Sequence, residues 1–199
     1  MNKFSLDKGR VNQKIKTRTR ILNAAKELMS QNKKISLEDV AERANVGRAT
    51  IYRYFPKIEL LFAEASLDIH SVPAEELFEK VKDQPLKEQI LYVQDYYNKL
   101  AQDHEVVFRR YLSTALTESI GSSHIIRGAR RVHAMKLILE SHKSELSEKD
   151  KKNLENASTI LMGIESLIVS KDVCGLSNKE TNATLNWAIE MILKGMRTD

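Results

Sequence analysis

The stretch SLEDVAERANVGRATIYRYFP, residues 36–56, decides the fold. Ser36 is a suitable N-cap, since its hydroxyl accepts a hydrogen bond from a free amide at a helix start. The short helix that it opens turns four apolar side chains inward: Leu37, Val40, Ala41 and Ala44. Asn45-Val46-Gly47 interrupts this helix, and a second one is expected to run from Arg48 to Phe55. Pro56 ends it, because proline lacks the amide N–H that would continue the helix.

A longer helix precedes these two. From Lys16 to about Gln31, apolar residues recur at helical spacing and mark one buried face: Ile21, Ala24, Ala25, Leu28 and Met29. Two short helices joined by a tight turn and packed on a third make a helix-turn-helix. The sequence therefore predicts a three-helix unit over residues 16–60.

The second short helix carries more polar side chains than solubility requires. Ile51 and Phe55, four residues apart, supply its buried stripe. The side chains that point elsewhere are donors or aromatics: Arg48, Thr50, Tyr52, Arg53 and Tyr54. Arginine suits guanine edges in a major groove, and hydroxyl groups suit phosphates. This content indicates DNA binding.

The charge distribution agrees with a polyanion partner. Residues 1–56 hold thirteen basic and five acidic residues, a net charge of +8, whereas the rest of the chain carries −3. The alternative is a solvated surface that happens to be basic. Residues 1–15 lack apolar periodicity and are expected to form a flexible basic arm. The basic residues expected to reach DNA lie in the arm and just after it: Lys3, Lys8, Arg10, Lys14, Lys16, Arg18 and Arg20.

Residues 17–65 resemble the N-terminal domain of the TetR family of bacterial regulators. The matching pieces are ILNAAKELM, SLEDVAERANV and ATIYRYFPKIELL. The resemblance implies an all-α fold of about nine helices, a homodimer bound to palindromic double-stranded DNA, and a C-terminal domain that binds an effector. The residues expected to contact DNA are Ser36, Arg48, Ala49, Thr50, Tyr52, Arg53, Tyr54 and Lys57.

Two positions depart from the family pattern. Gly47 stands where many members have Ser or Thr, so the recognition helix lacks a side-chain cap. Ile58 stands where many have a lysine that touches a phosphate, and the adjacent Lys57 is expected to replace it.

The chain beyond Pro56 is helical in pattern, and residues 61–199 are expected to form one effector-binding and dimerisation domain. Two segments, from Ser147 and from Ser177, have more than one apolar side, which favours a partner outside the domain. The residues expected at the dimer interface are Leu161, Ile164, Ile168, Trp187, Ala188 and Met191. The alternative is that both apolar stripes are intramolecular core.

Bulky mid-helix side chains are candidates for the effector pocket: Tyr92, Tyr96, Phe108, Tyr111, His133 and Met135. Such a lining suits a small hydrophobic ligand, although plain core is the alternative reading. The effector's identity stays open.

Other classes of protein fit the sequence less well. No histidine pair has zinc-site spacing beside a carboxylate, and no Gly-rich phosphate loop or Gly-flanked serine occurs, so no enzyme, metal or cofactor is expected. No apolar run is long enough for a membrane span, and Cys174 stands alone. A cytoplasmic regulator is therefore expected, and an adaptor of the same fold that has lost DNA binding is the remaining alternative.

Overall fold

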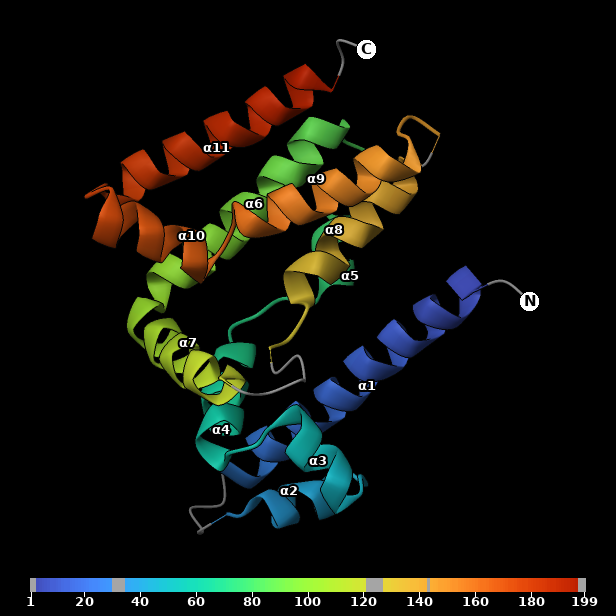
Figure 1. Ribbon diagram of the computed structural model, residues 1–199, viewed down its shortest axis with the longest axis vertical. Helices are drawn as coiled ribbons and strands as arrows, with labels where there is room; N and C mark the ends of the chain where they lie inside the picture. The colour runs from blue at the N-terminus through green and yellow to red at the C-terminus, as the bar shows by residue number, and fades with distance from the viewer. Residues whose placement is uncertain (1–2, 30–34, 121–126, 143, 197–199) are drawn as a thin grey trace. The chain divides into compact units, whose positions relative to one another are not determined.

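The computed structural model describes residues 3–29, 35–120, 127–142 and 144–196, with the backbone alone for residues 3–12. These residues form helices without a strand, which confirms the predicted all-α class (Figure 1). The helices are α1 (Lys3–Met29), α2 (Leu37–Arg43), α3 (Arg48–Tyr54), α4 (Ile58–Asp68), α5 (Ala74–Glu79), α6 (Leu86–Asp103), α7 (Glu105–Ser119), α8 (Arg130–Ser141), α9 (Glu148–Ile160), α10 (Ile164–Ile168), the π-helix η1 (Val169–Val173) and α11 (Asn178–Gly195).

The chain divides into two compact units. The first comprises Met1–His70 and Val106–Gly128, and the second comprises Ser71–Glu105 and Ala129–Asp199. The sequence placed one boundary at residue 60. The structure instead groups most of α7 with the first unit, because Tyr111 and Ala115 are buried in that unit's core.

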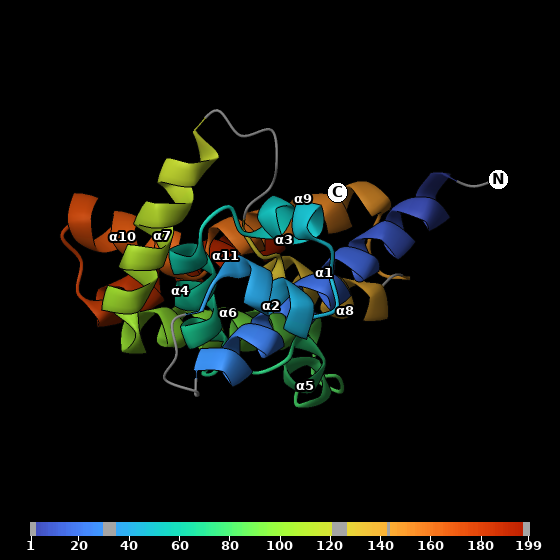
Figure 2. The ribbon, with the colours of Figure 1, turned by 90° about the horizontal axis from the view of Figure 1, so that it is seen from below.

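The first unit is built on α1, against which α2 and α4 pack, and α2 in turn packs against α3 (Figure 2). The predicted apolar residues Ile21, Ala24 and Ala25 are buried here, together with Ile51 and Phe55. The three-helix arrangement predicted from the sequence is therefore confirmed.

The first helix is longer than predicted. Its backbone begins at Lys3, whereas the sequence predicted an irregular arm through residue 15. Residues 3–15 contain no proline, and six of the thirteen are good helix formers. A helix already nucleated over residues 16–29 extends through such a segment at low cost. The side chains of Lys3, Lys8 and Arg10 lie outside the described residues.

In the second unit, α6 packs against α8, α10 and α11, and α8 packs against α5 and α9 (Figure 1). Serine side chains cap two of these helices: Ser147 caps α9, and Ser177 with Glu180 forms a capping box on α11. Gly175 adopts a positive φ of 67° before that cap.

The segment after Ser147, which has more than one apolar side, is not one continuous helix. α9 ends at Ile160 and α10 begins after Gly163, whose φ of 86° and ψ of −158° suit glycine alone. The Gly163 N–H donates to Asn98 Oδ1 at 2.8 Å, and the Arg131 guanidinium donates to the Met162 carbonyl. These contacts come from α6 and α8, so local spacing does not reveal them.

Candidate nucleic-acid interface

Local hydrogen bonds fix the two short helices. The Ser36 hydroxyl accepts from the Asp39 N–H at 3.2 Å, and the Asp39 carboxylate accepts from the Ser36 N–H at 2.8 Å. The hydrogen bonds that this carboxylate accepts from the Ser36 N–H and hydroxyl hold the pKa of Asp39 below its ordinary value. Asn45 takes the left-handed conformation in the turn, and the Val46 N–H donates to the Ala41 carbonyl at 2.9 Å. Ser36 thus has the capping role that the sequence predicted.

The third helix presents a polar face outward. Ile51 and the C-cap residue Phe55 are fully buried and anchor it. The remaining side chains predicted to contact DNA are exposed or half-buried: Arg48, Ala49, Thr50, Tyr52, Arg53 and Tyr54. Gly47 precedes the helix without a side-chain cap, as the sequence predicted.

A carboxylate that sequence reasoning missed holds part of this face. Glu38, in the first turn of α2, accepts a hydrogen bond from the Tyr52 hydroxyl at 2.9 Å. The Arg48 Nε lies 3.3 Å from the same carboxyl oxygen. The Tyr52 hydrogen bond, with a smaller contribution from Arg48, lowers the pKa of Glu38. The sequence feature that points to this contact is an acidic residue in the first turn of α2, the helix before the recognition helix α3.

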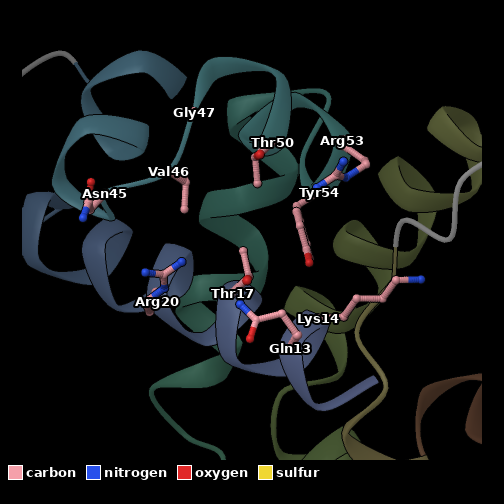
Figure 3. A pocket seen from close by; sticks show the side chains of 10 residues that line it. All are labelled: Gln13, Lys14, Thr17, Arg20, Asn45, Val46, Gly47, Thr50, Arg53 and Tyr54. Carbon is pink, nitrogen blue, oxygen red and sulfur yellow. The ribbon is translucent and has the colours of Figure 1, made fainter. Parts of the chain in front are cut away.

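A hollow of about 490 Å³ lies between α1 and α3. Its lining comes from α1, the turn and α3: Gln13, Lys14, Thr17, Arg20, Asn45, Val46, Gly47, Thr50, Arg53 and Tyr54. Figure 3 shows Arg20 near Asn45 at one end, and Lys14 near Tyr54 at the other. The lining contains three cations and no carboxylate, which suits an anion.

The cations of the first unit fall into two groups. Within the described part of the chain, Lys14, Arg20 and Arg53 form no ion pair with a carboxylate. Five others are paired: Arg18 with Glu64, Lys26 with Asp68, Arg43 with Glu27, Arg48 with Glu38 and Lys57 with Glu118. The hollow therefore gathers three cations that are available to an external anion.

Arg18 does not belong to the DNA-facing basic tract where the sequence placed it. Its Nε donates to Glu64 Oε1 at 2.7 Å, and the Tyr111 hydroxyl donates to the other oxygen at 2.8 Å. The Arg18 guanidinium also lies over the Phe55 ring, 4.4 Å from its centroid. Arg18 is an internal residue because its helical position turns it toward α4.

The comparisons with known proteins agree with this geometry. The family model described as bacterial regulatory proteins, tetR family, matches residues 21–65, which contain α2, α3 and the start of α4. This part of the chain is therefore similar to the DNA-binding domain of that family. A TetR transcriptional regulator from Rhodococcus sp. RHA1 has the same fold, with a TM-score of 0.50 and 16% identity over 89% of this chain and 96% of that one. The search of curated proteins finds no significant match.

The predicted effector residues fall in both units of the chain. Phe108 and Tyr111 fall in the first unit, whereas the other four fall in the second. Tyr92 is exposed and Met135 is fully buried. The two remaining residues have polar partners: the Tyr96 hydroxyl accepts from the Val72 N–H at 2.6 Å, and a His133 ring nitrogen lies 2.8 Å from a Glu75 oxygen.

The residues predicted at the dimer interface also differ in exposure. Ile164 is only 3% exposed, because the break at Gly163 turns α10 into its own unit's core. Leu161, Ile168, Ala188 and Met191 are half-buried, whereas Trp187 is 61% exposed. Further apolar side chains are exposed on the same unit: Ile160, Val169 and Val173. An apolar surface remains, but Ile164 is not part of it.

Two further observations concern other chemistry. Among the described residues, no group of three or more His, Cys, Asp or Glu side chains gathers as a metal site would need. No helix in the described ranges is long and apolar enough to cross a bilayer.

Proposed function

We propose that this regulator is a ligand-responsive repressor that acts in the cytoplasm and binds a palindromic operator as a homodimer. Residues 16–60 bind DNA in this proposal, and the remainder binds a small hydrophobic effector and the second subunit. The observation that carries the proposal is the outward polar face of α3 beside a carboxylate-free cationic hollow. Such a surface supplies both base-reading and phosphate-binding groups.

The proposed roles follow from side-chain chemistry. Arg48 and Arg53 read base edges, since a guanidinium bonds guanine with two hydrogen bonds. Thr50, Tyr52, Tyr54 and Lys57 hold phosphates, which orient the protein without reading sequence. Ser36 and Ala49 lie at the starts of α2 and α3, where they come close to the DNA backbone.

A specificity measurement tests these roles. Arg48→Ala is expected to lose about 1–3 kcal/mol on the operator and to relax the preference at one base pair. Tyr54→Phe, which removes a phosphate donor, should weaken operator and random DNA alike. Equal losses on operator and random DNA for Arg48→Ala would show that Arg48 does not read a base.

Dimerisation and effector response rest on the second unit. The exposed apolar side chains, Trp187 and Val173 among them, are the surface proposed to pack against a twin. An effector releases the operator only if it binds one shape of the dimer better than the other, and a coupling of about 1–3 kcal/mol is typical. Measuring operator affinity against a panel of apolar ligands tests this part, and an affinity that no ligand changes would contradict it.

A further inference from the structure

Lys57, proposed to hold a phosphate, already has an anionic partner. Its Nζ lies 2.6 Å from Glu118 Oε1, on the last turn of α7. The lysine side chain is 55% exposed, whereas that of Glu118 is 15% exposed. The hydrogen bond to Glu118 raises the pKa of Lys57, so the lysine stays charged but its charge is locally cancelled.

This pairing separates Lys57 from the cations of the hollow. Within the described residues Lys14, Arg20 and Arg53 form no ion pair, so a phosphate approaches them without displacing a carboxylate. A phosphate that approaches Lys57 meets the Glu118 carboxylate at hydrogen-bonding distance from the same ammonium group. Two anions at such separations repel one another.

We propose that Glu118 competes with a DNA phosphate for Lys57 and thereby lowers the affinity of this surface for DNA of any sequence. The inference rests on the proposed DNA-binding function. Phosphate contacts carry no sequence information, so the competition reduces the part of the affinity that is common to all DNA. Base reading by Arg48 and Arg53 is untouched.

The expected size follows from the exposure of the pair. Ion pairs between exposed side chains contribute little free energy, and this small contribution corresponds to a change of about 1.5- to 5-fold in a binding constant. Glu118→Gln should therefore tighten binding to DNA by about that factor for each Lys57 engaged. The salt dependence should also become steeper by about 0.9 in logarithmic slope per subunit, because one more phosphate is neutralised by a free cation.

The experiment uses the full chain and a short random-sequence DNA duplex, so it requires no operator. Fluorescence anisotropy at a series of salt concentrations gives the affinity and its slope for the wild type and Glu118→Gln. Glu59→Gln is the matched control, since Glu59 is an exposed carboxylate of α4 that acts on Lys57 through space without a hydrogen bond. Lys57→Met and the Lys57→Met/Glu118→Gln double variant complete a cycle.

Competition predicts a gain for Glu118→Gln that exceeds the gain for Glu59→Gln and disappears in the Lys57→Met background. Glu118→Ala, which also removes the carboxylate, should show the same gain if its unfolding curve matches the wild type. Unchanged binding by Glu118→Gln would overturn the proposal, and weaker binding would overturn it and show that Glu118 positions Lys57 for DNA. A gain that persists in the Lys57→Met background would overturn it as a general charge effect. A wild-type protein that binds no duplex would instead refute the proposed function.

Discussion

The buried polar network of Arg18, Glu64 and Tyr111 allows a stability prediction worked from its geometry. It joins α1, α4 and α7, and the Arg18 and Glu64 side chains are 11% and 4% exposed. Burial lowers the pKa of Arg18, but the adjacent Glu64 carboxylate outweighs this, so that the net pKa is raised. The arginine is therefore charged at every accessible pH, and Glu64 is the partner that makes its burial tolerable.

Arg18→Met should lower the free energy of unfolding by about 3–5 kcal/mol, because it leaves the buried Glu64 carboxylate without that charge. A loss of this size lowers the melting temperature on the order of 10 °C. Guanidinium chloride unfolding followed by circular dichroism measures it. Arg43→Met is the control, since it breaks an exposed pair with Glu27 and should cost less than about 1 kcal/mol.

The double variant Arg18→Met/Glu64→Leu sharpens the test. Replacing both charges with apolar side chains removes the unpaired carboxylate, so most of the lost stability should return. A loss for Arg18→Met no greater than for Arg43→Met would refute the reasoning. Additive losses in the double variant would show that the two residues do not act as a pair.

Three further predictions concern the hollow, the helix break and the apolar surface. Arg20→Ala should flatten the salt dependence of binding to a random duplex by about 0.9 in logarithmic slope. Lys16→Ala, on the same helix but outside the hollow, should change this slope less. Equal slopes for the two variants would show that the hollow is not part of the interface. Gly163→Ala should lower the free energy of unfolding in urea by about 1–3 kcal/mol, because φ at this position is positive and an added Cβ would lie 2.9 Å from Arg131 Nη1. An unchanged urea midpoint would contradict this. Trp187→Glu should give folded monomers in analytical ultracentrifugation, whereas Ile164→Glu should unfold the chain; a dimer that survives Trp187→Glu would place the interface elsewhere.

The helix-turn-helix could be predicted from the sequence because its determinants are local. Ser36, Pro56 and the spacing of Ile51 and Phe55 each act within one or two turns. The break at Gly163 could not be predicted in this way. It depends on Asn98, which lies 65 residues away in the chain, and on Arg131.

The same distinction applies to the interface. The polar face of α3 was evident from side-chain type, since Ile51 and Phe55 identify the buried side. The carboxylates that hold this face were not evident. Glu38 meets Arg48 across the turn, and Glu118 reaches Lys57 from a helix that the sequence assigned to the other domain. Tertiary packing, which spacing does not encode, decides which cations are left for DNA.

The central claim is that two copies of α3 read a symmetric DNA site. Selection of bound duplexes from a randomised library by the purified wild-type protein tests it most directly. The account predicts one enriched motif made of two inverted half-sites whose centres lie about one turn of DNA apart, roughly 34–36 Å. Enrichment of no motif, or of a single asymmetric half-site, would contradict it.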